Sequence, residues 1–143
     1  DIKAKKRYST TSVIVALTLS APFFAIMFGG TFKDSLFAFL IMAIQAAFIT
    51  FTSKYKLTLF VSNFLGAFIA TVSVLVLDKF FLIYNPLSII IVSLMPLVPG
   101  VQVTNAVRDF MAGDYLSGMI GIQAAIFVST AIALGVVMGL KLI

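Results

Sequence analysis

The stretch "LMPLVPGVQVTNAVRDFMAGD", residues 94–114, decides the fold of this chain. It begins as an apolar helix, meets two prolines and a glycine, and continues into the densest group of polar side chains in the sequence. A proline inside a helix removes a backbone hydrogen bond and clashes with the preceding turn, so it kinks or breaks the helix. The stretch therefore predicts a helix that is broken at Pro99-Gly100 and followed by a short polar helix.

The composition predicts that most of the chain lies in lipid. Hydrophobic residues make up 62% of the 143 residues, only 10% are charged, and the mean hydropathy is +1.17. A soluble domain is closer to half apolar and about a quarter charged. The alternating pattern of a transmembrane barrel is absent, so we expect an all-α membrane protein.

The residue types also narrow the possible functions. The chain has no cysteine and no histidine, and its five acidic residues are all aspartates. The lack of cysteine excludes disulfides and thiolate sites. The lack of histidine and glutamate excludes most transition-metal sites and most catalytic dyads. No nucleotide-binding motif is present. We expect no enzyme, no metal and no cofactor, and we interpret the net charge of +5 as topology and lipid contact rather than nucleic-acid binding.

Charged residues divide the chain into five uncharged runs, each close to the ~20 residues needed to cross a bilayer. We predict one membrane domain, 1–143, with spans at about 9–30, 34–53, 57–77, 85–110 and 116–141. The fourth span must be discontinuous, because a helix over residues 86–98 would be only about 20 Å long. Two local patterns support these boundaries: Thr31 with Asp34 predicts a capping box, and Asn85-Pro86 predicts a helix start.

Basic residues predict the orientation. If the N-terminus is cytoplasmic, seven lysines and arginines lie inside and three lie outside. The positive-inside rule therefore favours a cytoplasmic N-terminus and, with five spans, an outside C-terminus. The basic start could also belong to a signal peptide, but the apolar run over residues 8–32 is longer than a signal core should be.

Small residues recur along the third and fifth predicted spans, which favours close helix packing. Such rows serve either an oligomer interface or packing within one bundle, and for the fifth span both interpretations stay open. The rows are Ser62, Gly66 and Ala70 in the third span, and Gly121, Ala125, Ser129 and Ala133 with Ala131, Gly135 and Gly139 in the fifth.

The polar residues after the break share one face of a helix. At ~100° per residue they fall within an arc of about 160°. One interpretation is a half-helix whose N-terminus points partial positive charge at a carboxylate in a water-filled cavity. The alternative is an interfacial helix wetted by headgroups. The candidate binding residues are Gln102, Thr104, Asn105, Arg108 and Asp109.

Each charged residue of this region has a predicted role. Arg108 could hold a carboxylate with two hydrogen bonds, and Asp109 or Asp114 could attract an ammonium group or carry a proton. Amides inside the other spans usually hold helices together, but one that faces the cavity would join the site. Those amides are Gln45, Asn63 and Gln123.

Two motifs resemble the threonine/serine exporter family. "LMPLVPGVQVTNAVRDFMAGDYLSGM", residues 94–119, is similar to its long signature, and "FAIMFGGTFKDSLFAFL", residues 24–40, is similar to its first hairpin. Gln102 departs from the small or apolar residue expected there, and Ile122 and Gln123 stand where family members often have a charge. The family pattern implicates Asp34, Pro96, Pro99, Gly100, Thr104, Asn105, Arg108, Asp109, Gly113, Asp114, Ser117 and Gly118.

The resemblance implies a secondary exporter in the bacterial inner membrane that carries threonine and serine or, in split two-gene versions, dicarboxylates such as succinate. It implies a possible coupling role for Asp34 or Asp114. It also implies a soluble N-terminal region and a second five-span half, neither of which lies in residues 1–143, so that this chain would be one half of an inverted repeat. Expected partners are lipid, a small carboxylate, the second half and an oligomer of the chain. The competing hypothesis is a membrane scaffold whose polar helix docks a cytoplasmic partner.

Overall fold

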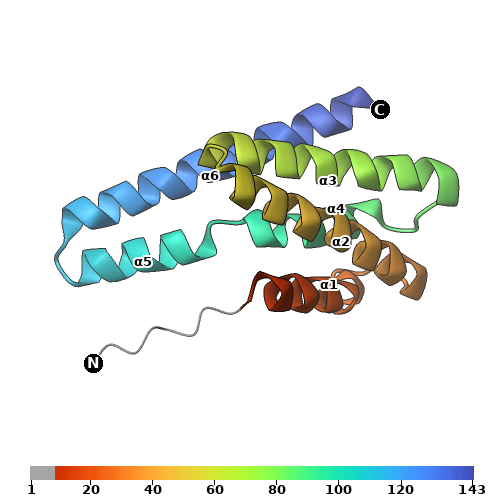
Figure 1. The fold of residues 1–143 in the computed structure, drawn as a ribbon, viewed down its shortest axis with the longest axis horizontal. Coiled ribbons are helices and arrows are strands. Elements are labelled where there is room, and N and C mark those ends of the chain that lie inside the picture. Colours follow the sequence, from red (N-terminus) through yellow and green to blue (C-terminus); the bar gives the residue numbers. More distant parts are fainter. Residues whose placement is uncertain (1–8) are drawn as a thin grey trace.

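The computed structural model describes residues 9–143, and this part of the chain is helical without any strand. The prediction of an all-α fold is therefore confirmed. Figure 1 shows the order of the elements along the chain. They are α1 (Thr10–Met27), α2 (Phe32–Tyr55), α3 (Leu59–Phe81), α4 (Pro86–Leu94), the 3-10 turn η1 (Met95–Leu97), α5 (Gly100–Met111) and α6 (Tyr115–Leu142).

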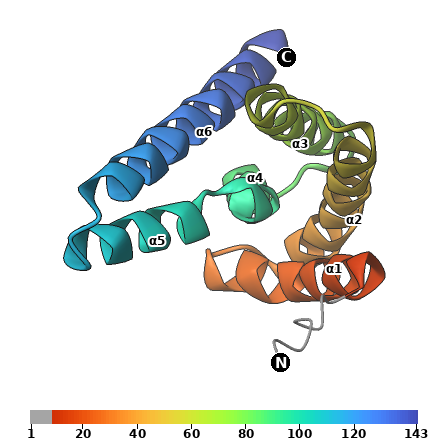
Figure 2. The ribbon, with the colours of Figure 1, turned by 60° about the vertical axis from the view of Figure 1, so that its left-hand side comes forward.

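The helices surround α4, which is short and central. It packs against α1, α2 and α3, while α5 and α6 form a hairpin that projects beyond the other helices (Figures 1 and 2). Small and branched side chains make the contacts at the centre, as expected where backbones approach closely in a membrane bundle. The buried cluster consists of Ala21, Ala25, Ala38, Ile41, Met42, Val74, Ile83, Ile89, Ile90 and Val92.

Glycines let α6 lie directly against its neighbours. A Cβ on Gly139 would lie 2.9 Å from the Cβ of Thr71 in α3, and a Cβ on Gly121 would lie 2.8 Å from the Cβ of Ala106 in α5. Gly135 is buried against the backbone of Phe64 in the same way. These three glycines of the small-residue rows therefore pack against other helices of the same chain. Other members of the rows, such as Ser129, are exposed.

The α3 and α6 helices run in the same direction. Gly135 lies beside Phe64 and Gly139 beside Thr71, so the residue numbers increase together along the contact (Figure 1). The chain must therefore return from one end of the bundle to the other between Phe81 and Tyr115. The elements α4, η1 and α5 make this return, which favours one broken crossing over a loop that enters and leaves on the same side.

The predicted break is present. Pro96 lies in η1, where the helix narrows, Val98 is extended with φ −62° and ψ 129°, and α5 starts at Gly100. The two halves of the pair are bent by 52°. The missing N–H groups of Pro96 and Pro99 explain why regular helix stops here.

The prediction of five spans is supported only in part. Three helices, α2, α3 and α6, are long and apolar enough to cross a membrane, and the bent pair would make a fourth. The apolar helix before them, Thr11–Met27, is shorter than the ~20 residues that a crossing usually needs. Its end is set by Gly29, whose φ of +88° turns the backbone out of the helix, although the uncharged run continues to Phe32.

Candidate solute site

The α5 helix is amphipathic, and its apolar side lies against α6. Ala106 is 1% exposed, and the ring of Phe110 lies so close to Gly118 that a Cβ there would be 2.9 Å from it. The opposite side, which carries Thr104, Asn105 and Arg108, is exposed. The predicted polar side is therefore exposed at these three residues, while on the predicted apolar side Ala106 is buried and Val103 and Val107 stay exposed.

A mostly apolar groove that contains three amide side chains lies where the broken helix meets the start of α3. It has a volume of about 460 Å³. This lies within the range of ~300–1,000 Å³ that is typical of pockets for small ligands. Two of the predicted binding residues, Gln102 and Asn105, line the groove. Asn63 of α3 adds another amide side chain to its wall. The remaining lining residues are Leu59, Pro96, Leu97, Val98, Val101 and Val128.

The groove also contains the start of α5. Pro99 occupies the N-cap position and offers no side chain that could accept a hydrogen bond from the first turn. The first N–H groups of a helix have no partner within it, and together they carry partial positive charge. The N–H of Gly100 already donates to Val98 O at 2.8 Å, and the N–H of Val103 donates to Pro99 O at 3.1 Å. The N–H groups of Val101 and Gln102 therefore carry the partial positive charge at the start of α5.

Two polar side chains near the groove already have local partners. The amide nitrogen of Asn63 donates to Leu59 O at 2.7 Å, and the hydroxyl of Thr104 donates to Gly100 O at 2.9 Å. Thr104, Arg108 and Asp109 do not line the groove. The structure therefore brings together two of the five predicted binding residues and places the other three at its edge or outside it.

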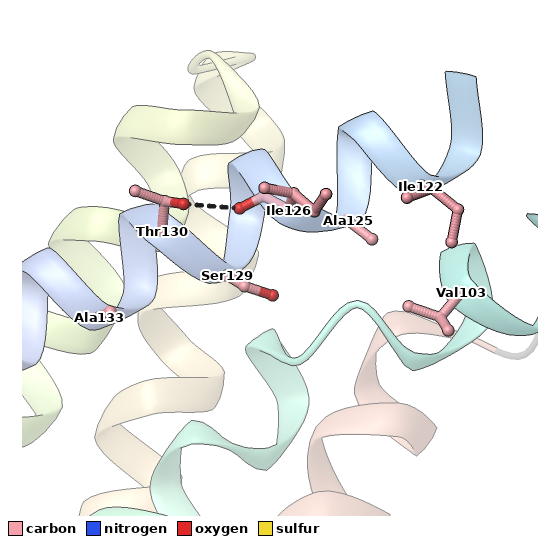
Figure 3. Close-up of a pocket in the computed structure, with 7 residues that line it drawn as sticks. All are labelled: Val103, Ile122, Ala125, Ile126, Ser129, Thr130 and Ala133. Carbon is pink, nitrogen blue, oxygen red and sulfur yellow. Dashed lines mark hydrogen bonds between the residues drawn. The ribbon is translucent and has the colours of Figure 1, made fainter. Parts of the chain in front are cut away.

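A second cavity, between α5 and α6, is apolar. It also has a volume of about 460 Å³, and Figure 3 shows Val103 facing Ile122 across it. The hydroxyl of Thr130 donates to Ile126 O at 2.8 Å (Figure 3), which leaves the exposed hydroxyl of Ser129 as the main polar group on its wall. Such a surface suits a lipid chain or another helix rather than a carboxylate.

The turn between α5 and α6 explains another part of the motif. Gly113 has φ +84°, a left-handed conformation that favours glycine. Asp114 caps α6, with its Oδ1 accepting from the backbone N–H of Ser117 at 3.1 Å. Hydrogen bonds from Ser117, first from its side chain and then from its backbone, lower the pKa of the Asp114 carboxyl below its ordinary value. These residues shape the turn, and Gly118 accommodates Phe110 beneath it.

Asp34 forms a clamp at the N-terminal end of α4. It is 1% exposed, and its Oδ2 accepts from the backbone N–H of Thr31 at 2.9 Å and of Asn85 at 3.2 Å. Its Oδ1 accepts from Tyr84 N at 3.2 Å. The carboxylate thereby joins the α1–α2 turn to the α3–α4 turn, and both predicted caps, at Thr31 and at Asn85, are confirmed.

The whole chain matches one family model. The model described as "Putative threonine/serine exporter" (ThrE) covers residues 1–143. This chain belongs to the threonine/serine exporter family. No curated protein and no solved structure is a significant match to it.

The exporter signature therefore has two kinds of residue in this structure. Pro96, Pro99 and Gly100 make the break, and Gly113 and Asp114 make the turn. Gln102 and Asn105 both place an amide on the groove wall. Of these two, Asn105 matches the family pattern and Gln102 departs from it. The roles of Arg108 and Asp109 in binding stay predictions.

The sequence offers three amides in apolar spans, Gln45, Asn63 and Gln123, and predicts that one facing the cavity joins the site. Nothing in their spacing shows which of them lies near residues 94–114. Asn63 lines the groove, and Gln45 is buried where Gly66 also approaches Leu97, a lining residue of the groove. Only the packing of α2 and α3 around the break reveals this.

Proposed function

We propose that this chain is the membrane part of one half of a secondary exporter that moves small carboxylates, such as threonine and serine, out of the cell. The observation that carries the proposal is the groove at the break. There the uncapped start of α5 meets the amides of Gln102, Asn105 and Asn63. Helix ends of this kind bind the carboxylates of substrates in transporters with broken helices.

The position of the groove supports export from the cytoplasm. It lies at the end of the bundle where α3 begins, next to the turn that carries Lys54 and Lys56. The positive-inside rule assigns this end to the cytoplasm. Arg108 lies about one helical turn beyond Asn105, and a basic rim of this kind attracts anionic solutes to the mouth. We propose a bacterial inner-membrane location with a cytoplasmic N-terminus.

The topology supports a pairing of two halves. The parallel course of α3 and α6, with one broken crossing between them, fits an arrangement in which α1 supplies a fifth crossing. An odd number of crossings would let a second half take the opposite orientation, with the solute between the halves. We propose that the exporter works in this form, coupled to an ion gradient, and that Asp34 or Asp114 is the candidate coupling residue.

Dicarboxylates such as succinate are the alternative cargo. An anion site at one helix start would bind either solute by one carboxylate, so the cargo must be decided by transport. A scaffold is the second candidate function, and the projection of the α5–α6 hairpin beyond the other helices favours it (Figure 2). An exposed polar helix outside the bundle is a suitable surface for docking a cytoplasmic protein.

Efflux from cells that express the complete transporter tests the proposal. We expect Asn105→Leu to lower threonine efflux at least about tenfold, because a good polar contact of ~1.4 kcal/mol corresponds to a factor of ten. The matched control is Gln123→Leu, which removes an exposed amide of α6 outside the groove and should change efflux less than about twofold. Equal efflux from wild type and Asn105→Leu would contradict the site. Absence of threonine release from the wild type would contradict the function.

A further inference from the structure

Gln45 is a buried amide without a partner. It lies in α2, is 1% exposed, and within the described chain neither Oε1 nor Nε2 has a hydrogen-bond partner. Burying an amide in an apolar environment without hydrogen bonds is unfavourable, and native structures rarely leave both ends of such a group unpaired. A leucine or methionine would fill the same volume without this cost, so the amide requires a bonding partner in some state of the protein.

The space around the Gln45 amide is provided by a glycine. A Cβ on Gly66 of α3 would lie 3.2 Å from Gln45 Nε2 and 3.2 Å from the Cδ1 of Leu97. These distances are shorter than ordinary contacts, so any larger residue at position 66 would press on both side chains. Gln45, Gly66 and Leu97 therefore meet at one point, beside the break.

Leu97 takes part both in this contact and in the groove. Its Cδ1 lies near the position beside Gln45, and Leu97 also lines the groove together with Asn63 and Gln102. It ends the η1 turn, where helical hydrogen bonding is interrupted between the two prolines. A shift of the Leu97 side chain would extend the groove toward the amide.

The chemistry of the amide indicates which group it would bind. Nε2 donates and Oε1 accepts, so a carboxylate can satisfy only the nitrogen and an ammonium only the oxygen. A hydroxyl both donates and accepts, and it can bond to both atoms. We propose that Gln45 is the residue that selects hydroxyl-bearing solutes. It binds the side-chain hydroxyl in an occluded subsite that opens when Leu97 moves, while the α5 start binds the carboxylate.

This inference rests on the proposed function, and paired solutes test it separately. Threonine and serine are compared with 2-aminobutyrate and alanine, which lack only the hydroxyl. A site built to bind a hydroxyl discriminates strongly against the analogue without it, whereas an apolar pocket does not. We expect wild type to prefer threonine over 2-aminobutyrate in competition, and Gln45→Met to reduce this ratio at least about tenfold while alanine efflux persists.

Two further variants complete the test. Gln123→Met removes an exposed amide and should leave the ratio unchanged. Gly66→Ala keeps the amide but narrows its surroundings, and it should lower the ratio in the same direction as Gln45→Met. If the Gln45→Met protein does not reach the membrane, the threonine ratio of Gly66→Ala tests the proposal instead.

Each outcome has one meaning. An unchanged threonine ratio in Gln45→Met and Gly66→Ala, including a loss of efflux that is equal for all four solutes, overturns the inference and indicates that the amide holds only a structural water. If wild type exports these solutes without preferring the hydroxyl, the inference also fails while the proposed function stands. If wild type exports none of them, the proposed function fails as well.

Discussion

Buried polar groups are hydrogen-bonded at the N-terminal end of α4, whereas some of those near its C-terminal end lack partners within the described chain. At its N-terminal end, the carboxylate of Asp34 accepts three backbone N–H groups and is almost completely enclosed. At its C-terminal end, the α5 start has no capping side chain and the Gln45 amide has no partner. Both ends interrupt helices in an apolar bundle, but only one of them completes its own hydrogen bonding.

The difference separates structure from function. Unpaired backbone groups are costly in hydrocarbon, so interrupted helices persist only where protein, water or a solute satisfies them. The Asp34 clamp satisfies its own interruptions, and Ser88 adds a hydrogen bond from its hydroxyl to Phe28 O at 2.8 Å. The break leaves bonding capacity free beside a groove. We therefore interpret the first end as mainly structural and the second end as the location of the proposed solute site.

The largest effect is expected from removing the clamp. Asp34→Leu would leave the N–H groups of Thr31, Tyr84 and Asn85 without their acceptor. A hydrogen bond to a charged group contributes about 1.5–3 kcal/mol, so we expect the loss of three such bonds to cost at least ~3 kcal/mol of stability. Thermal unfolding of the purified protein in detergent measures this loss. A melting temperature within 2 °C of wild type, on the order of 1 kcal/mol or less, would show that the clamp is not structural.

A milder change at the same position separates the two roles proposed for Asp34. Asp34→Asn keeps one acceptor oxygen, so it should destabilise less than Asp34→Leu. If Asp34 only clamps the turns, folded Asp34→Asn protein should export threonine with the same dependence on the proton gradient as wild type. Efflux that no longer responds to the gradient would instead support the coupling role.

The smallest effect is expected at the α5–α6 turn, which is an exposed version of the clamp. The pKa of Asp114 is lowered in the folded state, so its ionised form stabilises the fold at pH values above the ordinary pKa of 3.8. This contribution is lost as the pH falls through the lower, folded-state pKa. We expect Asp114→Ala to lower the melting temperature slightly at pH 7, and Asp114→Asn to retain most of the cap.

Melting curves between pH 7 and pH 3 check this sign. The difference between wild type and Asp114→Ala should shrink as the pH falls. A difference that grows toward acid pH would contradict the assignment of Asp114 as an ionised cap.

Local chemistry explains what the sequence predicted correctly. The break follows from prolines that lack N–H groups, and the caps follow from side chains three residues away from the amides that they bind. The polar side of α5 follows from helical periodicity. All of these are decided by neighbours in the chain, so the sequence was sufficient.

Tertiary packing explains what the sequence could not predict. The helical wheel placed five polar residues in one arc, but only the position of α3 determines that Gln102 and Asn105 line the groove and that Arg108 does not. Asn63 and Gln45 lie near residues 94–114 because α2 and α3 pack at the break. The predicted count of five spans is supported only in part, because Gly29 ends α1 before the uncharged run ends.

Water access at the break tests the central claim most directly. The chain has no cysteine, so a single Asn105→Cys variant reports only on the groove wall, with Gln123→Cys on α6 as the matched control. A water-soluble thiol reagent is applied to membranes that carry the complete transporter, with and without threonine. We predict that position 105 reacts and that threonine slows its labelling at least about threefold while position 123 is unaffected. Equal labelling of position 105 with and without threonine would contradict a solute site at the break and would favour the scaffold.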